Sequence, residues 1–208
     1  LLCLIGSVSV ASSANVVPPM EEHRGIWITR WTYKSPEHVR EIIHDVAGAG
    51  FNAVYFQVRG QHDAFYPSEV EPWAQDLTGV LGKDPGWDPL AVAIEAGHQQ
   101  GIEVHAYINA FPMWRGEAPP GESTPIHAWT RHPEWAVADM DGSPMTLNEG
   151  YVFASPGNPD VRQRLVAVAA DIDRRYKVDG IHLDYIRYPG AKYGRDMASM
   201  AAWEHAGR

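Results

Sequence analysis

Apolar segments alternate with amphipathic segments along this chain, and that alternation constrains the fold more than any other feature. Four apolar segments are predicted strands: 25–30, 53–58, 103–109 and 178–186. Amphipathic segments with apolar residues at helical spacing are predicted helices: 35–48, 88–100 and 158–176, with the beginning of a fourth at 197–206. Regular alternation of strand and helix favours a parallel sheet.

The connections between these segments are unequal in length. Those that follow the first three helices are short, whereas the second and third strands are followed by long loops at 59–85 and 111–157. We expect a small hairpin within the second loop, near 135–151. Long loops after strands are typical of a (β/α) barrel, whose active site is built from those loops. A doubly wound open sheet is the alternative, but the residues after the first strand, Arg30 to Tyr33, lack the glycines of a phosphate-binding turn.

Helix starts and chain length define the domain. Ser35-Pro36 and Asp88-Pro89 each combine a capping side chain with a proline at the first helical position. A complete (β/α)8 TIM barrel needs about 250 residues, and only about the first four β/α units are countable here. We therefore expect 24–208 to form the N-terminal half of a barrel that continues beyond residue 208, and the 208 residues alone to be inactive.

The first residues resemble an export signal. The apolar run that ends at Val10 is too short to cross a bilayer, and Ser12 and Ala14 suit a signal peptidase. We interpret 1–14 as an N-terminally truncated signal peptide and 15–23 as a linker. This predicts an exported protein of the periplasm, cell envelope or extracellular space, without an integral membrane span. A lipid anchor on Cys3 and a buried N-terminal strand are the alternatives.

The overall charge and the motif content limit the classes of partner and cofactor that the protein is expected to bind. A formal net charge of −9 disfavours nucleic-acid binding, because acidic chains repel phosphate backbones. The sequence has no phosphate loop and no Gly-x-Ser-x-Gly nucleophile motif. We therefore expect no cofactor.

Polar side chains alternate with aliphatic ones in three of the predicted strands. His182 and Asp184 share one face of the last strand, as do Tyr107 and Asn109, and Gln57 and Arg59, in theirs. Helices outside a barrel pack against aliphatic residues, so the polar side chains of each strand should point into the barrel. Asp184 should then lie at the open end of the barrel, where the strands end. A buried carboxylate is costly unless it is paired.

Alternative roles remain open for the charged residues. Asp184 can instead form a structural ion pair with Arg59 or Arg187. His105, His182 and Asp184 form the one candidate metal set across neighbouring strands, but the sequence has no His-x-x-x-His pair, and we expect no metal. Asp63 and Glu71 lie on the loop after the second strand, within reach of the site, and Glu71 is expected to be solvated.

Several motifs match a known family in order and spacing. The longest are Gly50-Phe51-Asn52-Ala53-Val54-Tyr55-Phe56-Gln57-Val58-Arg59, Gly82-Lys83-Asp84-Pro85-Gly86-Trp87-Asp88-Pro89-Leu90 and Val178-Asp179-Gly180-Ile181-His182-Leu183-Asp184-Tyr185. Over 22–190 the chain resembles the bacterial glycosyl-hydrolase-like family ten. The resemblance implies a (β/α) barrel, an envelope or extracellular location and action on glycans, including bacterial cell-wall glycans. Relatives often carry Asp-Asp-Tyr in the last motif, whereas here Tyr185 directly follows Asp184.

These observations predict a glycoside hydrolase that acts on a bacterial envelope or extracellular polysaccharide, with peptidoglycan glycan strands as one candidate. Asp184 is the predicted catalytic residue, and its partner carboxylate is expected on a later strand. The predicted substrate-contacting residues are Trp27, Gln57, Arg59, Asp63, Tyr107, Asn109, Trp114, His182 and Tyr185. A non-catalytic glycan-binding barrel and a metal-dependent hydrolase or deacetylase are the alternative functions.

Overall fold

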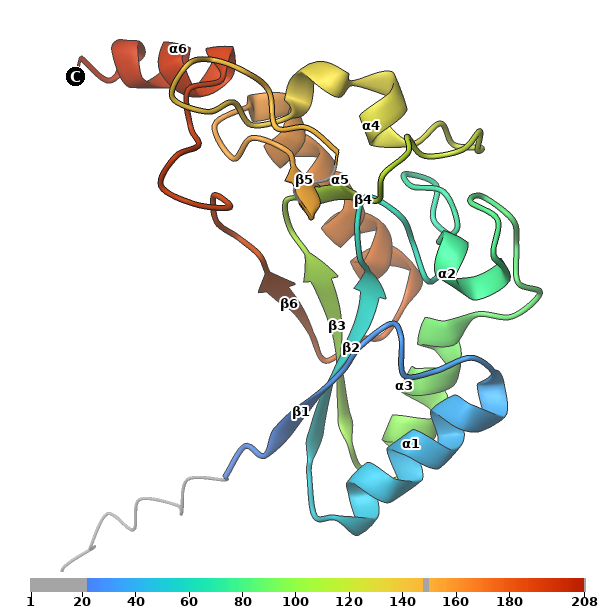
Figure 1. Cartoon of the computed structure of the whole chain (residues 1–208). Coiled ribbons are helices and arrows are strands. Elements are labelled where there is room, and N and C mark those ends of the chain that lie inside the picture. The colour runs from blue at the N-terminus through green and yellow to red at the C-terminus, as the bar shows by residue number, and fades with distance from the viewer. Residues whose placement is uncertain (1–21, 148–149, 208) are drawn as a thin grey trace, which may run out of the picture.

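A four-stranded parallel sheet forms the centre of the molecule (Figure 1). The computed structural model describes residues 22–147 and 150–207, so the predicted signal peptide and most of the predicted linker lie outside the described residues. The strands lie in the order β1 (Gly25–Ile28), β2 (Ala53–Arg59), β3 (Glu103–Asn109) and β6 (Gly180–Asp184). The main helices are α1 (Pro36–Gly48), α3 (Pro89–Gln99) and α5 (Pro159–Arg175). This succession confirms the predicted alternation.

Each main helix begins at a capping side chain followed by proline. Ser35 accepts a hydrogen bond from the backbone N–H of His38, and Asp88 accepts from the N–H groups of Leu90 and Ala91. Asn158 caps α5 in the same way. These side chains satisfy backbone donors that have no partner within the helix. The predicted starts are therefore confirmed.

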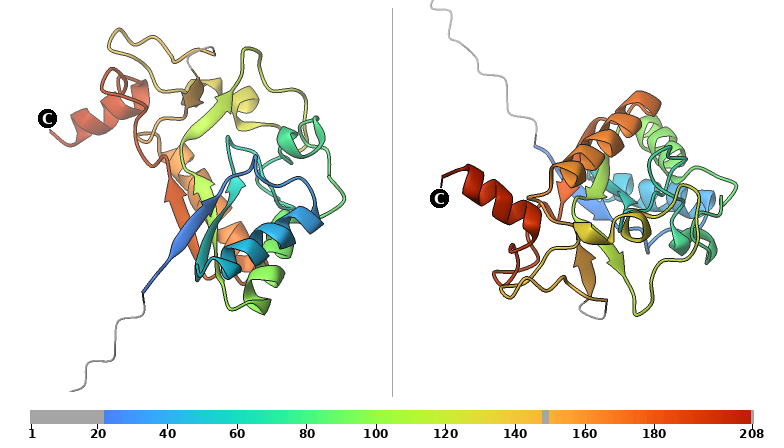
Figure 2. Two further views of the ribbon diagram at one scale, coloured as in Figure 1. Left: turned by 60° about the horizontal axis from the view of Figure 1, so that its bottom comes forward. Right: turned by 90° about the horizontal axis from the view of Figure 1, so that it is seen from above.

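The outer face of the sheet forms the main apolar core. Alternate residues of β2 and β3 are fully buried there: Val54, Phe56, Val58, Val104, Ala106 and Ile108. They belong to one cluster with the apolar residues of α1 and α3, including Val39, Ile43 and Leu90. The two further views show these helices on one side of the strands (Figure 2). At β6 the cover is thinner, and Leu183 is 39% exposed.

The inner face is strongly curved, as in a barrel wall. Trp27 of β1 donates a hydrogen bond from Nε1 to Nε2 of His182 in β6 at 3.2 Å, although β2 and β3 lie between the two strands. A flat sheet would hold these side chains too far apart, since neighbouring strands are spaced by about 4.8 Å. Glycines make room for the rings: a Cβ on Gly180 would lie 2.4 Å from the His105 ring.

The long loops fold into a second layer over the carboxyl ends of the strands (Figure 1). This layer contains α2 (Gln75–Thr78), α4 (Ala128–Arg131), a 3-10 turn at Pro133–Trp135 and the antiparallel pair β4 (Pro112–Arg115) and β5 (Tyr151–Phe153). It has its own apolar cluster, which includes Phe111, Met113, Trp135, Val137 and Val152. The helix α6 (Met197–His205) ends the described chain, as predicted for 197–206.

Some predicted boundaries in this region were wrong. The small hairpin expected near 135–151 is present over a shorter range: Ala138 bridges Pro144, with backbone hydrogen bonds from Asp139 to Ser143 and from Met145 to Val137. Tyr151 belongs instead to β5, which pairs with β4. The last sheet strand ends at Asp184 rather than at residue 186, since Tyr185 takes a left-handed backbone with φ 50°. None of the described helices is long and apolar enough to cross a bilayer.

Candidate active site at the carboxyl end of the sheet

Asp184 is the last residue of β6 and lies beside Asn109 at the end of β3. Its carboxylate is held from two sides. Oδ2 accepts a hydrogen bond from the Tyr107 hydroxyl at 2.9 Å, and Oδ1 accepts one from the backbone N–H of Tyr185 at 2.6 Å. The side chain is half-buried. A carboxylate that is oriented by two donors yet remains accessible is suited to contact a substrate.

The two candidate structural partners of Asp184 are engaged elsewhere. Arg59 forms an ion pair with Glu71, and the Arg187 guanidinium lies over the Tyr185 ring, 5.1 Å from its centre. Among the described residues, no basic side chain lies within ion-pair distance of Asp184. Its only side-chain partner there is the neutral hydroxyl of Tyr107. Burial, together with the Asp184 hydrogen bond, raises the pKa of Tyr107 well above its usual range, so that the hydroxyl remains a donor at neutral pH.

A row of rings covers the inner face below Asp184. Trp27 stacks on Tyr55 with ring centres 5.0 Å apart, and His182 lies 4.7 Å from Tyr55 and 5.5 Å from Tyr107. Trp27 is 55% exposed. The structure therefore brings three of the predicted contact residues, Trp27, Tyr107 and His182, together with Asp184.

The metal alternative receives no geometric support. His105 pairs with Glu103 on its own strand, 3.0 Å away, while His182 is bonded to Trp27. In the part of the chain that the structure describes, no three side chains of ligand type are grouped so that they could hold a metal ion.

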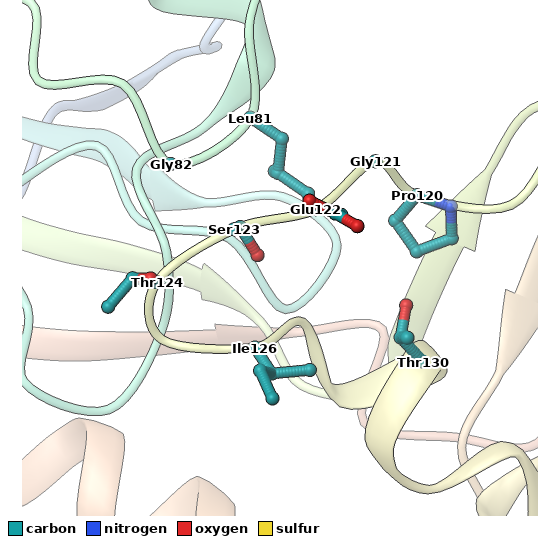
Figure 3. Close-up of a pocket in the computed structure, with 9 residues that line it drawn as sticks. All are labelled: Leu81, Gly82, Pro120, Gly121, Glu122, Ser123, Thr124, Ile126 and Thr130. Atoms are coloured by element: carbon teal, nitrogen blue, oxygen red, sulfur yellow. The ribbon is translucent and has the colours of Figure 1, made fainter.

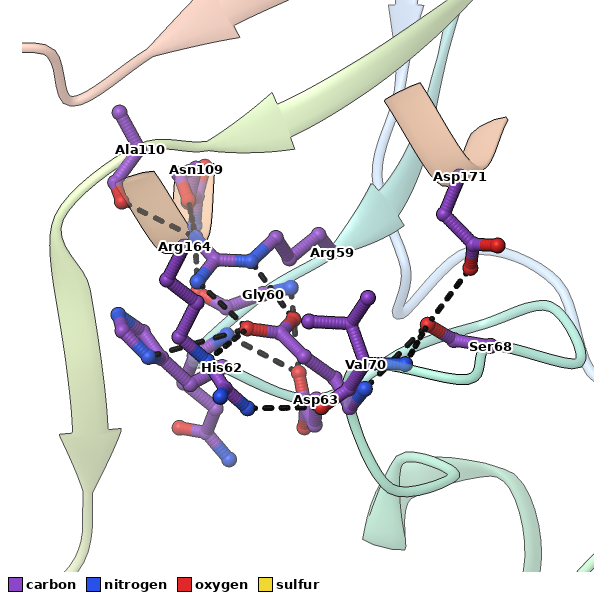
Figure 4. Close-up of polar contacts among 12 residues, drawn as sticks. Arg59, Gly60, His62, Asp63, Ser68, Val70, Asn109, Ala110, Arg164 and Asp171 are labelled. Atoms are coloured by element: carbon purple, nitrogen blue, oxygen red, sulfur yellow. Dashed lines mark hydrogen bonds and ion pairs between the residues drawn. The ribbon is translucent and has the colours of Figure 1, made fainter. Parts of the chain in front are cut away.

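Arg59 forms a buried ion pair with Glu71, and the contacts of Arg59 with Asn109 and Ala110 can be followed in Figure 4. The Nε and Nη2 atoms of Arg59 donate to the two carboxylate oxygens of Glu71 at 2.7 and 2.8 Å. Its Nη1 donates to the carbonyl oxygens of Asn109 and Ala110, and Arg164 of α5 lies 3.2 Å from Glu71. Both partners of the pair are 1% exposed. Arg59 thus joins the ends of β2 and β3 to the long loop and α5.

Two sequence predictions are corrected by this pair. Arg59 is buried rather than open at the strand end, because the loop after β2 folds back and covers it: Ala64 bridges to both Arg59 and Trp73. Glu71 is not solvated. Burial by itself would raise the pKa of Glu71, but the charge and hydrogen bonds of Arg59 outweigh burial and keep that pKa below its usual value.

Gln57, Asn109 and Asp63 also serve the backbone rather than an open site. Gln57 accepts from the N–H of Arg30, and Asn109 donates to the carbonyl of Gly60. Asp63 accepts from the N–H groups of Gly60 and Gln61. All three are at most 2% exposed. Their burial contradicts direct substrate contact in this structure, and their bonds indicate that they shape the loop after β2.

Trp114 and Tyr185 have different surroundings. Trp114 of β4 is 6% exposed, its ring packs against His127, and Nε1 donates to the carbonyl of Ala118. It therefore does not offer the predicted open stacking face. Tyr185 lies next to Asp184, and its ring contacts Tyr151, 6.0 Å between centres.

Tyr151 is a site residue that sequence reasoning missed. It accepts a hydrogen bond from Nη2 of Arg30 at 3.1 Å, and the Arg115 guanidinium lies 5.8 Å from its ring centre. Tyr151, Phe153 and Tyr185 line a hollow of about 370 Å³. A three-residue strand inside a long loop has too little periodicity to be recognised in advance.

A second hollow, of about 610 Å³, lies between the loops after β2 and β4 (Figure 3). Its lining includes Leu81, Glu122, Ser123, Thr124 and Ile126. It shares no lining residue with the surroundings of Asp184 described above. Its lining contains no aromatic side chain, so we assign it no part in the site.

The curved parallel sheet, with helices packed on its outer face, has the architecture of a (β/α) barrel. An α-galactosidase from Thermus thermophilus matches the structure with a TM-score of 0.52 at 16% identity, over 88% of this chain and 36% of that one. A hypothetical protein from Ruminiclostridium thermocellum matches with a TM-score of 0.59 at 18% identity, covering 87% of this chain and 90% of its own. These likenesses show a partial (β/α) barrel.

The family model for glycosyl hydrolase-like 10 matches residues 22–208, and the chain belongs to that family. Glycosyl hydrolase YngK of Bacillus subtilis is 32% identical over 213 residues, which cover 97% of this chain and 40% of YngK. Glycosyl hydrolase DigH of Escherichia coli K12 is 30% identical over 174 residues, 74% of this chain and 38% of DigH. The chain thus spans about two fifths of the length of these relatives.

Proposed function

We propose that this protein is a glycosidase that cleaves a bacterial envelope or extracellular polysaccharide, and that Asp184 supplies one of its two catalytic carboxyl groups. Glycosidases of most families place two carboxyl groups on either side of the bond that is cleaved. The observation that carries the proposal is the half-buried Asp184 carboxylate at a strand end, held by Tyr107 and the Tyr185 N–H. Membership of the glycosyl hydrolase-like family supports the same chemistry.

In this proposal the remaining parts of the site have separate tasks. Tyr107 keeps the carboxylate in one orientation, and the exposed face of Trp27 offers a flat apolar surface for a sugar ring. The Arg59–Glu71 ion pair holds the carboxyl ends of β2 and β3 in place. Asp63 and Glu71 are both fully buried, so we assign neither as the second carboxyl group. We place that group elsewhere in the protein.

The substrate and the location belong to the proposal. Peptidoglycan glycan strands are our first candidate substrate, because the family resemblance points to bacterial wall glycans. The apolar segment before Ser12 and Ala14 suits export to the periplasm, the envelope or the medium, where such strands lie. Retention of the first 14 residues on the protein isolated from its native host would contradict this location.

The test is Asp184→Asn in the full-length protein, assayed against a panel of wall and extracellular glycans. We expect cleavage to fall by roughly 10³-fold or more, as for the loss of a reacting group, while glycan binding persists. Asp173→Asn, at an exposed position on α5, is the matched control and should retain full activity. Unchanged cleavage by Asp184→Asn would remove Asp184 from the catalytic set. Glycan binding without cleavage by the unsubstituted protein would favour a binding barrel instead.

A further inference from the structure

Tyr151 contacts residues that follow the first and the last strand of the sheet. Its hydroxyl oxygen accepts a hydrogen bond from Nη2 of Arg30, just after β1, at 3.1 Å. Its ring centre lies 6.0 Å from that of Tyr185, which directly follows Asp184. The side chain is half-buried and comes from β5, in the layer of loops over the strand ends (Figure 1). Tyr151 therefore reaches across the open end of the curved sheet.

The hydroxyl of Tyr151 also lies in the neighbourhood of the proposed catalytic carboxylate. Tyr107 donates to Asp184, and the proximity of Tyr151 contributes to the raised pKa of Tyr107. Two tyrosines from different layers of the molecule thus approach the same carboxylate. One comes from the sheet and holds Asp184, while the other comes from the loops and has no bond to Asp184.

Arg30 is held in one orientation by its surroundings. Its side chain is 2% exposed and passes so close to Gly60 that a Cβ there would lie 1.3 Å from Nη1. Two carboxylates balance its charge: Oδ2 of Asp76 is 3.2 Å from Nε, and Oδ1 of Asp63 is 3.8 Å from Nη1. A buried charge is costly unless it is paired, so the guanidinium cannot turn away without loss of these contacts.

The hydrogen bonds of the Arg30 side chain are directed at Tyr151. Nη2 donates to its hydroxyl, whereas Nε and Nη1 are buried without a hydrogen-bond acceptor among the described residues. Arg59 differs, because its side chain donates to both carboxylate oxygens of Glu71. Buried donors are usually satisfied by the fold. The contrast indicates that Arg30 orients the Tyr151 hydroxyl.

The proton of that hydroxyl is available to a ligand. A tyrosine hydroxyl accepts at its oxygen and donates its own proton, whereas a guanidinium only donates. Tyr151 is therefore the acceptor in its bond with Arg30, and no residue that the structure describes accepts the Tyr151 proton in return. Burial raises the pKa of Tyr151, so the hydroxyl keeps this proton at neutral pH.

We propose that Tyr151 is a substrate-contacting residue whose hydroxyl donates a hydrogen bond to an oxygen of the sugar chain bound at Asp184, and that Arg30 is its positioning residue. The inference rests on the proposed glycosidase function. A few fixed polar groups set the orientation of a ligand in most binding sites. A donor whose oxygen is bound to a guanidinium is strengthened by that positive charge.

Fluorine NMR of the full-length protein, labelled with 3-fluorotyrosine, tests the contact. The Tyr151 signal is the one that Tyr151→Phe lacks. N-acetylchitohexaose and an N-acetylglucosamine–N-acetylmuramic acid hexasaccharide are added in turn to the Asp184→Asn protein, so that no probe is consumed. At least one should shift the Tyr151 signal, and calorimetry should show roughly tenfold weaker binding of that probe once Tyr151→Phe is added. A signal that neither probe moves would overturn the contact.

Arg30→Lys tests the positioning role. Lysine keeps the positive charge near Asp63 and Asp76 but lacks the fork that reaches Tyr151 as well. Without any probe, Arg30→Lys should shift the Tyr151 signal. Arg24→Lys should not, because Arg24 lies at the opposite end of β1 and bonds to the carbonyl of Gly50.

Affinities of the combined variants separate positioning from folding. In the Asp184→Asn protein, Arg30→Lys should weaken the shifting probe about as much as Tyr151→Phe does, and the two together should be no weaker than Tyr151→Phe alone. Losses that multiply would show that Arg30 does not act through Tyr151. If Arg30→Lys does not fold, the probe-induced shift and the affinity of the Tyr151→Phe protein decide the contact.

The outcomes also distinguish this inference from the proposed function. A probe-dependent shift of the Tyr151 signal, without cleavage of any glycan by the unsubstituted protein, retains the contact and refutes the glycosidase. Cleavage at an unchanged rate by Tyr151→Phe, with unchanged affinity, retains the glycosidase and refutes the contact. Tyr176→Phe is the matched control: its hydroxyl donates to Asp88 at the start of α3, and its loss should change neither affinity nor cleavage.

Discussion

Replacing Arg59 with methionine tests whether the buried ion pair holds the strand ends together. Methionine keeps much of the aliphatic stem but removes the two bonds to Glu71 and those to the carbonyls of Asn109 and Ala110. Glu71 is then left buried, with Arg164 as its remaining cationic neighbour within 4 Å among the described arginines. Breaking such a pair from one side costs about 3–5 kcal/mol.

Urea unfolding, followed by circular dichroism, measures this loss. With a denaturant slope of about 3 kcal/mol per molar urea, the unfolding midpoint should fall by roughly 1–2 M. Arg40→Met is the control, because the ion pairs of Arg40 with described residues, to Glu37 and Glu95, are long and solvent-exposed at 4.0 and 3.9 Å. Its midpoint should move by less than about 0.3 M.

A double variant separates the pair from simple loss of packing. Arg59→Met combined with Glu71→Leu removes both charges, so its destabilisation should be smaller than the sum of the two single effects by about 1–3 kcal/mol. The reasoning fails if Arg59→Met shifts the midpoint by no more than the Arg40 control. It also fails if the two single effects simply add.

Three further outcomes follow from the same geometry. The pKa of Glu71 is lower in the folded state than its ordinary 4.5, so its carboxylate stabilises the fold above that pH, and this contribution is lost as the pH falls towards the folded value. Glu71→Gln should therefore lose less stability than the parent between pH 4.5 and 3 in urea titrations. Burial lowers the pKa of His62 well below 6.5, so the unfolded chain takes up that proton first and stability declines below pH 6.5, by at most about 1.4 kcal/mol per pH unit. His62→Asn, which tolerates the left-handed φ of 58°, should show a shallower decline over pH 6.5–5. Tyr107→Phe removes the hydrogen bond to Asp184 and should lower kcat roughly 10- to 100-fold with KM nearly unchanged.

Each of these outcomes has a contradicting result. Parallel acid profiles of parent and Glu71→Gln would show that this carboxylate has no lowered pKa in the folded state. An equal decline in the parent and His62→Asn would mean that His62 is not kept neutral by burial. For Tyr107→Phe the control is Tyr176→Phe, whose hydroxyl donates to Asp88 at the start of α3, away from Asp184. If both tyrosine variants change kcat equally, Tyr107 acts on stability rather than on the carboxylate.

The sequence by itself determined the elements and the two faces of the sheet. Strand and helix periods, and caps such as Ser35 and Asp88, depend on residues close together in the chain. They can therefore be predicted from the sequence alone. The alternation in β3 and β6 placed Tyr107 and Asp184 on one face, and the structure joins them by a hydrogen bond. Because side chains alternate strictly along a strand, the contact between Tyr107 and Asp184 could be predicted from the sequence to within one neighbouring residue on the same face.

Only the tertiary structure decided which polar residues are available to a ligand. From the sequence, Arg59 is expected at the open carboxyl end of the sheet. In the structure the loop after β2 folds back over it, so that Arg59 pairs with Glu71, which also contacts Arg164 of α5. Tyr151 reaches Tyr185 only because β5 pairs with β4 above the sheet. Long loops contain no regular period, and their return path is determined by packing against distant residues. Burial of an arginine, or exposure of a groove, is therefore a property of the folded chain and not of any local pattern.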